Sequence, residues 1–366
     1  MQRRFIGEMD DDFLSKTVID VKGVGRTLVI LGDSSSRRPE VIHLIASLSG
    51  AVEVVLSPGG VPEFDDFRRI RLTADPAEPG CVVAIGGGRV LDIGKMLATW
   101  PADPDTLKTA VEGGQSLARR IPLVAVPTTA GSGSESTPFA VVYLHGRKHS
   151  LDHPTLLPDV AVVDYRLMAA VPRPAAAAAG LDVLCQCIES LLSRRTTPAS
   201  GRDARRGLIL AMGGLQGAMA REARSMRRMA LAANLGGRAI AVTRTTIPHA
   251  LSYPLSYRYG LAHGHAVALS MGRYLEQFGR SLSNSSGLRP WSDAYGFVLS
   301  VLGSAGPSDV APVWTRLVEG VGLPSTLAAL GISRTDADDQ TRAYDRSRFA
   351  NSPMPAQSVD VPALFD

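Results

Sequence analysis

Three of the seven histidines in this sequence lie within one segment, RTTIPHALSYPLSYRYGLAHGHAVAL, at residues 244–269. They are His249, His263 and His265, and cationic and hydroxyl side chains surround them in the segment. Imidazole side chains bind divalent transition metals and transfer protons near neutral pH. The segment therefore indicates either a metal-dependent site or a polar patch in a helical core.

A carboxylate and an amide at helical spacing extend the candidate metal set. Asp182 and Gln186 are four residues apart in GLDVLCQCIES (180–190), so they lie on one helix face. His249 and His263 are 14 residues apart, and they either share a helix face or lie on consecutive segments around one pocket. One Asp with two His suits Fe²⁺ or Zn²⁺, and Gln can add a neutral carbonyl oxygen. For each histidine, a hydrogen-bonded place in the core is the alternative.

Two loops of small residues follow predicted strands, where phosphates bind in α/β folds. In AIGGGRVLDIGK (84–95), glycines let the backbone approach a phosphate, and the following helix offers free N–H groups. The loop VPTTAGSGSESTPF (126–139) adds small residues and hydroxyls after the next strand. The GxGxxG dinucleotide fingerprint is absent, and either loop alone can be a tight turn. As a pair at neighbouring strand ends, they predict a nucleotide-binding crevice.

A third turn, VILGDSSSRR (29–38), has the position of an adenosine ribose site. Asp33 can accept hydrogen bonds from ribose hydroxyls, which favours NAD. Ser34–Ser36 with Arg37 and Arg38 can instead hold a 2′-phosphate, which favours NADP. A surface turn without a ligand is the third interpretation.

The apolar pattern indicates the elements that position these residues. The first half alternates β-branched apolar runs with helical stretches such as residues 38–48, which predicts a doubly wound parallel sheet. From residue 169 strong helix formers take over, with a polar loop expected at 279–294. We therefore expect a Rossmann-like α/β domain at 1–168 and an all-α domain at 169–366. The predicted strands are 27–32, 52–57, 81–88 and 122–129, with further strands within 139–151 and 158–168.

The composition is that of a folded globular protein. Of 366 residues, 45% are hydrophobic and 20% are charged, and the net charge is +4. Dense Lys/Arg runs with interleaved aromatics are absent from the sequence, which argues against nucleic-acid binding. Three cysteines do not form a disulfide framework and fit a reducing cytoplasm. The sequence contains neither a secretory leader nor an uncharged apolar run of roughly 18–20 residues, so we expect no membrane segment.

Four motifs, in order, resemble those of the iron-containing alcohol dehydrogenase family. The family carries GGGSxxDxAK, PTTxGTGSE, GxDAxxHAxE and HxxxHP…PHG. This chain has GGGRVLDIGK, PTTAGSGSE, GLDVLCQCIE and HALSYPLSYRYGLAHG. The resemblance covers nearly the whole chain. It implies a Rossmann-like domain and a helical domain that binds metal and substrate, with metal and nicotinamide meeting in the cleft between them.

By position, the resemblance implies metal ligands at Asp182, His249 and His263, and it puts Gln186 where the family has a further histidine. Tyr253 replaces the second histidine of HxxxHP, a position discussed as a proton conduit. The implied cofactors are a divalent metal, Fe²⁺ or Zn²⁺, and NADH or NADPH, and the expected assembly is a homodimer. The implied dinucleotide contacts are Asp33, Gly86, Gly87, Gly88, Asp92, Thr128, Thr129, Ser132 and Lys148.

A narrower similarity concerns the substrate. The segments TRTTIPHALSY and HGHAVAL are similar to those of phosphonoacetaldehyde reductases, which reduce phosphonoacetaldehyde to 2-hydroxyethylphosphonate with NADH or NADPH. A dianionic phosphonate needs a fixed cation and hydroxyl donors, which an arginine and threonines in this segment can supply. The alternative to phosphonate binding is that the arginine forms a salt bridge within the helical domain. His265 either relays a proton or only bonds within the protein. The candidate substrate residues are Arg244, Thr245, Thr246 and Arg258.

Three other functions stay open at this point. The first is a general metal-dependent alcohol dehydrogenase for small aldehydes or diols. The second is a lyase of the related dehydroquinate-synthase type, which recycles its bound NAD. The third is a catalytically inactive binding or regulatory homologue, an alternative that the glutamine at position 186 raises.

Overall fold

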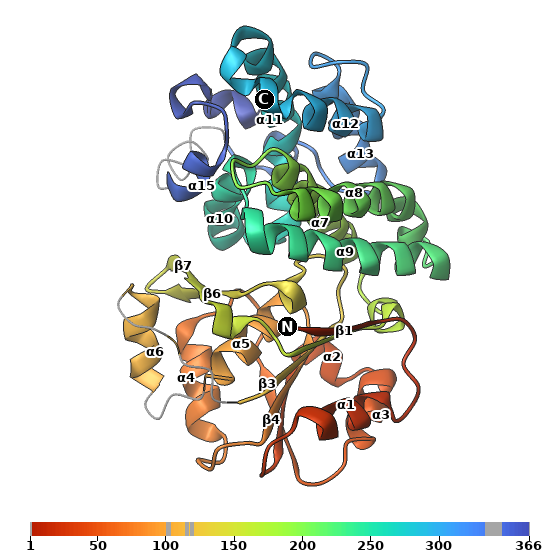
Figure 1. Ribbon diagram of the computed structural model, residues 1–366, viewed down its shortest axis with the longest axis vertical. Coiled ribbons are helices and arrows are strands. Elements are labelled where there is room, and N and C mark those ends of the chain that lie inside the picture. Colours follow the sequence, from red (N-terminus) through yellow and green to blue (C-terminus); the bar gives the residue numbers. More distant parts are fainter. Residues whose placement is uncertain (1, 100–103, 114–116, 118–120, 334–345, 366) are drawn as a thin grey trace. The chain divides into compact units, whose positions relative to one another are not determined.

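Apolar strands pair side by side in the first half of the chain (Figure 1). The computed structural model describes residues 2–99, 104–113, 117, 121–333 and 346–365, and the chain divides into two units, Met1–Val171 and Pro172–Asp366. The boundary expected at residues 168–169 lies a few residues before this division. Among the described residues of the first unit, six strands form one parallel sheet in the order β1-β8-β5-β4-β2-β3. They are β1 (Arg3–Ile6), β2 (Thr27–Gly32), β3 (Val52–Ser57), β4 (Cys81–Gly86), β5 (Leu123–Pro127) and β8 (Val160–Val163).

The apolar runs predict most of these strands well. Strands β2 and β3 have the predicted bounds. Strands β4 and β5 are shorter than predicted, because the residues at their carboxyl ends leave the sheet as loops. The pattern misses β1, whose sequence RRFI is not an apolar run. Pairing with β8, from the far end of the same unit, defines β1 instead.

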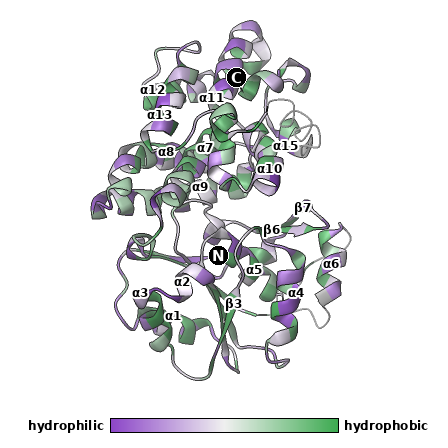
Figure 2. Cartoon of the chain, turned by 180° about the vertical axis from the view of Figure 1, so that it is seen from behind, coloured by the Kyte–Doolittle hydropathy of each residue, from purple (hydrophilic) through white to green (hydrophobic). Residues whose placement is uncertain are grey.

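Helices cover both faces of the parallel sheet, which confirms the predicted fold class. Successive residues of a strand point to opposite faces. Leu28 and Ile30 of β2 therefore pack with α4, α5 and α6, and Val29 and Leu31 pack with α1 and α3. Figure 2 shows the strands as largely hydrophobic beside helices of mixed polarity. The helices are α1 (Phe13–Val21), α2 (Asp33–Ser36), α3 (Pro39–Ala46), α4 (Phe64–Thr73), α5 (Gly88–Leu97) and α6 (Pro104–Val111).

The strands predicted within 139–151 form a hairpin of their own. Strands β6 (Phe139–Leu144) and β7 (Arg147–Asp152) pair antiparallel in a separate two-stranded sheet. The turn residues His145 and Gly146 both have positive φ, as the tightest hairpin turns require.

The order of strands reverses between β2 and β4. The chain runs from β2 outwards to β3, then crosses back to β4 on the other side of β2. Leu31 pairs with Ile85 and Gly86 pairs with Pro127, so the loops after β2, β4 and β5 leave the sheet at one edge. Such a reversal opens a crevice at the carboxyl ends of the strands, where open α/β sheets bind ligands.

A fully buried lysine connects α5 to the loop after β5. Lys95 Nζ donates to the hydroxyl oxygens of Ser134 (2.7 Å) and Thr137 (3.0 Å) and to the carbonyl oxygen of Phe139 (2.7 Å). It also lies 3.4 Å from Asp92 Oδ1, which accepts a hydrogen bond from Ser134 Oγ (2.6 Å). Burial lowers the pKa of Lys95, and the Asp92 carboxylate opposes that shift. The network holds the two predicted phosphate loops in one arrangement.

Amid the helices of the second unit, α7 is central. It packs against α8, α9 and α11, and most of its residues from Ala177 onwards are buried. The prediction of a polar loop at 279–294 is wrong, because α11 continues to Asn284 and α12 begins at Ser292. Polar residues there occupy exposed helix faces, which composition alone does not distinguish from a loop. The helices are α7 (Arg173–Leu191), α8 (Pro198–Met219), α9 (Ala223–Thr243), α10 (Ile247–Tyr259), α11 (His263–Asn284), α12 (Ser292–Leu302), α13 (Val310–Gly320) and α15 (Arg346–Asn351).

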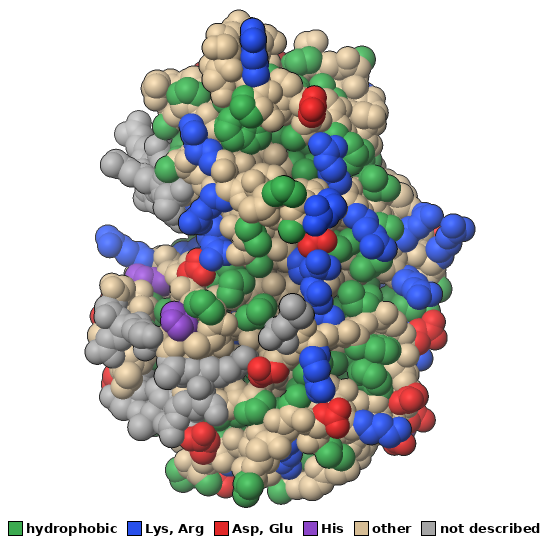
Figure 3. Space-filling model, in the orientation of Figure 1, with side chains coloured by type: hydrophobic (Ala, Val, Ile, Leu, Met, Phe, Trp, Pro, Cys, Tyr) green, Lys and Arg blue, Asp and Glu red, His purple; other side chains and the backbone are tan. Residues whose placement is uncertain are grey.

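On the face drawn in Figure 3, Lys and Arg side chains gather mainly over the helical unit, with apolar and uncharged side chains between them. Within the described ranges, each helix is too short or too polar to cross a lipid bilayer.

We predict that Lys95→Met lowers the free energy of unfolding by about 3–5 kcal/mol, because Asp92 then stays buried without its cation. Thermal or urea unfolding of the purified protein measures this. Lys16→Met is the control, because Lys16 is largely exposed and pairs only with the exposed Asp12. Equal effects of the two substitutions would contradict the role of Lys95.

Candidate functional site

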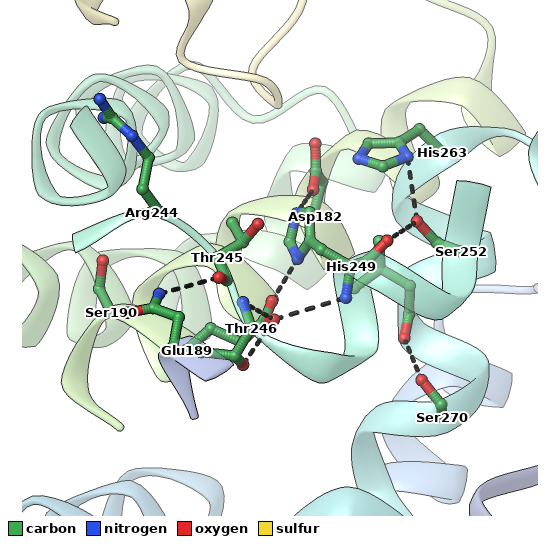
Figure 4. A network of polar contacts seen from close by, with 12 residues as sticks. Asp182, Glu189, Ser190, Arg244, Thr245, Thr246, His249, Ser252, His263 and Ser270 are labelled. Atoms are coloured by element: carbon green, nitrogen blue, oxygen red, sulfur yellow. Dashed lines mark hydrogen bonds and ion pairs between the residues drawn. The ribbon is translucent and has the colours of Figure 1, made fainter. Parts of the chain in front are cut away.

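Asp182, His249 and His263 come together in the C-terminal unit (Figure 4). One potential ligand atom of each lies within 4.8 Å of the other two, and His249 Nε2 is 3.3 Å from Asp182 Oδ1. The centroids of the two imidazole rings are 5.3 Å apart. Asp182 and His249 are buried, whereas His263 is exposed. Solvent therefore reaches the cluster from the His263 side.

Three helices position this cluster. Asp182 projects from α7, His249 lies in the first turn of α10, and His263 is the first residue of α11. The two histidines thus lie on consecutive segments, the second of the two sequence-based alternatives. Gly264 lets α11 approach α7, because a Cβ at this residue would lie 2.1 Å from the Ala178 carbonyl oxygen. Any larger residue at 264 would push His263 away from Asp182.

Electrostatics favour the ionised form of Asp182. Burial alone raises its pKa, but hydrogen bonding with His249 and the charge of His263 outweigh burial and lower the pKa below its usual value. Burial lowers the pKa of His249, and the Glu189 and Asp182 carboxylates reverse that shift and raise its pKa to about 9. The two carboxylates therefore favour a positive charge at His249, which a bound divalent cation would supply in place of the proton.

Glu189, a buried glutamate to which the sequence analysis assigns no role, orients His249. Glu189 Oε2 bonds His249 Nδ1, so Nε2 is the nitrogen left to face Asp182. Glu189 Oε1 accepts from the Thr246 main-chain N–H and hydroxyl, both at 2.8 Å, at the start of α10. A carboxylate behind a metal-binding histidine fixes the tautomer and ring orientation. The signal was available, because Glu189 follows Asp182 by seven residues, two helical turns along the same face.

Gln186 lies buried one turn after Asp182 on α7. Its side chain is hydrogen-bonded to Asp182, and because a carboxylate only accepts, the amide N–H is the donor. Its Oε1 lies towards α9, where a Cβ added at Gly236 would be 3.2 Å away. In this arrangement the amide orients Asp182, and the expected role of Gln186 as a metal ligand stays a prediction.

The two candidate proton-transfer residues differ in their surroundings. His265 is buried, and its Nε2 is 2.7 Å from the Pro324 carbonyl oxygen, so it donates there. Tyr253 stacks on His263 with ring centroids 5.9 Å apart. The geometry favours Tyr253 over His265, although the catalytic role of each stays a prediction. Arg258, a candidate substrate residue, is exposed in the last turn of α10 and lies over its neighbour Tyr259.

The other candidate substrate residues form the connection from α9 to α10. Thr246 is fully buried and its hydroxyl bonds Glu189, which gives it a structural role, and its substrate contact stays a prediction. The Arg244 guanidinium donates to the Ala241 carbonyl oxygen of its own helix. Figure 4 shows its side chain extending away from Asp182, with Thr245 between the two. Substrate contacts of Arg244 and Thr245 stay predictions.

In the N-terminal unit, the two glycine- and hydroxyl-rich loops lie against each other. The Thr128 N–H donates to the Gly86 carbonyl oxygen at 2.9 Å. A Cβ at Gly88 would lie 2.6 Å from Ser132 Oγ, so only glycine allows this approach. A Cβ at Gly87 would lie 3.5 Å from Thr129 Oγ1, which is an ordinary contact distance. The structure thus brings these six predicted cofactor residues together at the carboxyl ends of β4 and β5.

The remaining predicted cofactor residues have partners within the protein. Asp92 accepts bonds from Ser134 and from the Val141 N–H, so it supports the loops from behind. Asp33 opens α2 after β2, at the edge where the strand order reverses, and pairs with Arg37 at 2.9 Å. The acidic group that suits NAD and the arginine that suits NADP thus stand at one turn. Lys148 is half-buried on β7.

The Asp182, His249 and His263 cluster fits a divalent metal by its chemistry. One ionised carboxylate and two imidazoles are a donor set that Fe²⁺ and Zn²⁺ bind. Glu189 supplies the supporting contact such histidines have in metal sites. An exposed side at His263 leaves room for a substrate oxygen.

We expect Glu189→Gln to weaken divalent-metal binding by about 10- to 100-fold, because an uncharged amide has one acceptor oxygen, whereas Glu189 uses two for Thr246 and His249. Competition with a chelator measures this affinity without any enzyme assay. Glu276→Gln is the matched control, since Glu276 is also buried in the helical unit but pairs with Arg273 and Arg280. Unchanged affinity in Glu189→Gln would show that the contact does not support the metal.

Comparisons with known proteins agree with this arrangement. Residues 11–165 match the model of iron-containing alcohol dehydrogenase, and residues 176–366 match that of the Fe-containing alcohol dehydrogenase family, C-terminal. A phosphonoacetaldehyde reductase of Streptomyces viridochromogenes is 37% identical over 261 residues, which cover 68% of this chain and 66% of that enzyme. Long-chain-alcohol dehydrogenase 1 of Geobacillus thermodenitrificans is 30% identical over 293 residues, 78% of this chain and 74% of that enzyme. The match to the first relative thus spans just under two thirds of its length.

Solved structures share the fold over nearly the whole chain. An iron-containing alcohol dehydrogenase from Thermococcus thioreducens has a TM-score of 0.84 at 24% identity and covers 100% of this chain and 97% of its own. A sulfoacetaldehyde reductase from Bifidobacterium kashiwanohense, in complex with NAD⁺, has a TM-score of 0.83 at 23% identity and covers 99% and 95%. As its four motifs imply, this chain belongs to the iron-containing alcohol dehydrogenase family.

Proposed function

We propose that this protein is a metal-dependent NAD(P)H oxidoreductase that reduces phosphonoacetaldehyde to 2-hydroxyethylphosphonate by hydride transfer. The observation that carries the enzyme class is the convergence of Asp182, His249 and His263 in a member of this family. The Streptomyces relative, named a phosphonoacetaldehyde reductase, supports the finer substrate assignment. In this proposal the enzyme acts as a homodimer in the cytoplasm.

Two cofactors supply the chemistry. Asp182, His249 and His263 would hold a divalent ion, which would supply a Lewis acid for a carbonyl oxygen, and a bound reduced nicotinamide would supply the hydride. In this proposal the loops Gly86–Gly88 and Thr128–Ser132 bind the dinucleotide phosphates. The two loops pack closely together, and the glycines carry no side chain that would keep a phosphate from the backbone. Asp33 contacts the adenosine ribose.

Side chains of the helical unit hold and orient the reacting groups. Glu189 fixes His249 with Nε2 forward, and the Gln186 amide keeps the Asp182 carboxylate in place. Tyr253 packs against His263 on the exposed side of the cluster, where it can pass a proton between solvent and the product oxygen. His265 is the less favourable route, since its Nε2 bonds a main-chain carbonyl oxygen.

Phosphonate binding rests on Arg244 and Thr245. A dianion gains most from a guanidinium, whose planar donors match its oxygens, and a hydroxyl adds a further bond. The Arg244 side chain must swing from the α9 carbonyl oxygens to reach a substrate. Fixing the far end of the substrate would align its carbonyl carbon for hydride transfer.

The direction of the Arg244 side chain favours one other candidate. With its guanidinium on its own helix, Arg244 directs its charge away from the cluster, which suits a small neutral aldehyde. The relative named a long-chain-alcohol dehydrogenase supports an uncharged substrate, although not its small size. The second candidate is therefore a general alcohol dehydrogenase on the same catalytic centre.

We expect His263→Ala to lose bound metal and to lower aldehyde-dependent NADH oxidation by at least about 100-fold, because the carbonyl loses its Lewis acid. Metal analysis and NADH absorbance on one preparation measure both effects. His43→Ala, at an exposed histidine on α3, should leave both unchanged. Wild-type activity in metal-free His263→Ala would overturn the mechanism, and NAD recycling without net NADH loss would indicate a lyase.

For the substrate, we expect Arg244→Ala to lower kcat/KM for phosphonoacetaldehyde about tenfold or more, and to spare an uncharged aldehyde such as propionaldehyde. Arg244→Lys should fall between, because an ammonium keeps the charge but not the paired donors. Kinetics with both aldehydes and both cofactors measure this. Sulfoacetaldehyde, with one negative charge fewer, tests whether charge alone decides. Equal losses on both aldehydes would favour the general alcohol dehydrogenase.

A further inference from the structure

The backbone at Arg244 has a conformation that side-chain-bearing residues avoid. Its φ is 60° and its ψ is −178°, a region that is essentially restricted to glycine. Such strain persists only where surrounding contacts hold the chain in place. Arg244 lies between the last residue of α9 and the start of α10, whose first turn carries His249. The strained residue therefore lies in the connection that leads along the chain to His249 of the metal cluster.

A side chain from the far end of the chain holds both neighbours of Arg244. Asn351 Nδ2 donates to the carbonyl oxygen of Thr243 at 2.8 Å and to that of Thr245 at 2.9 Å. Its Oδ1 accepts from Ser193 Oγ at 3.0 Å, and Ser193 Oγ also contacts the Thr243 carbonyl oxygen at 3.1 Å. Asn351 is buried, so water does not compete for these bonds. The amide thus spans the strained peptide.

The main chain at Asn351 is itself fixed by the loop after α7. The Arg194 N–H donates to the Asn351 carbonyl oxygen at 2.9 Å. The Arg194 guanidinium donates to the carbonyl oxygens of Ser352 at 2.9 Å and Pro353 at 3.1 Å. Anchoring of this kind lets a short helix near the end of the chain hold a loop against its conformational preference.

We propose that Asn351 is a positioning residue that holds the strained loop Thr243–Thr246 in the form that presents Thr245 to the substrate. Glu189 fixes the Thr246 end of this loop, and Asn351 fixes the Thr243 and Thr245 carbonyl oxygens. The two clamps leave Thr245 between the Arg244 backbone and the metal cluster (Figure 4). The substrate part of this inference rests on the proposed function, and the strain part does not.

A stability comparison tests the strain. Glycine adopts this backbone conformation without cost, so Arg244→Gly should melt about 2–6 °C above Arg244→Ala. At Arg206, an exposed residue inside α8, the same pair should show the opposite order, because glycine weakens a helix. In an Asn351→Ala background the difference at position 244 should shrink, since a released loop can relax. Alanine more stable than glycine at both positions would overturn the proposal.

Kinetics test the positioning role. Asn351→Ala, and Asn351→Asp, whose carboxylate cannot donate to the two carbonyl oxygens, should raise KM for phosphonoacetaldehyde about tenfold with kcat within about threefold and bound metal unchanged. Gln277→Ala is the matched control, because Gln277 likewise bonds both main-chain groups of one residue, Asp360, outside the site. An unchanged KM in both Asn351 variants would refute the role. A wild-type protein that reduces no aldehyde would refute the proposed function, while the melting comparison would still decide the strain.

Discussion

The buried carboxylate of Glu189 is the contact on which the metal cluster depends. It is fully excluded from water and accepts from the Thr246 N–H and hydroxyl, with His249 Nδ1 on its other oxygen. An isolated buried charge is very costly, so it persists because several donors converge on it, among them free N–H groups at the start of α10. One side chain thus sets both where α10 begins and which nitrogen of His249 faces Asp182. The rest of the site is built around that orientation.

In the N-terminal unit, a few buried contacts likewise fix the loops at one edge of the sheet. Its parallel sheet reverses strand order beside β2, which brings three loops to one edge. The loops keep their shape because Lys95 and Asp92 pair behind them and because Gly88 admits Ser132. The residues that a family motif marks as nucleotide-binding are therefore of two kinds. Some lie in the two loops themselves, whereas Asp92 holds the loops from behind.

The sequence pattern predicts those elements whose formation depends on nearby residues. Strands β2 and β3 are apolar, β-branched runs whose bounds follow from their sequence, and α7 follows from its helix formers. Strand β1 and the hairpin turn at His145 depend on pairing and backbone twist, which no short window contains. In the site, motif spacing finds Asp182, His249 and His263. Motif spacing does not find Asn351, because its role depends on hydrogen bonds to two carbonyl oxygens more than a hundred residues earlier in the chain.

Three of the predicted site residues share one physical feature, namely a hydrogen-bond partner within the protein. Thr246 bonds Glu189, the Gln186 amide bonds Asp182, and His265 bonds the Pro324 carbonyl oxygen. A buried polar group must be paired, so the first partner in reach determines its role. Residue type and spacing state what a side chain can do, and the hydrogen-bond geometry determines which of those options stays available. Thr245 lies between the Glu189 and Asn351 contacts, and its substrate contact stays a proposal.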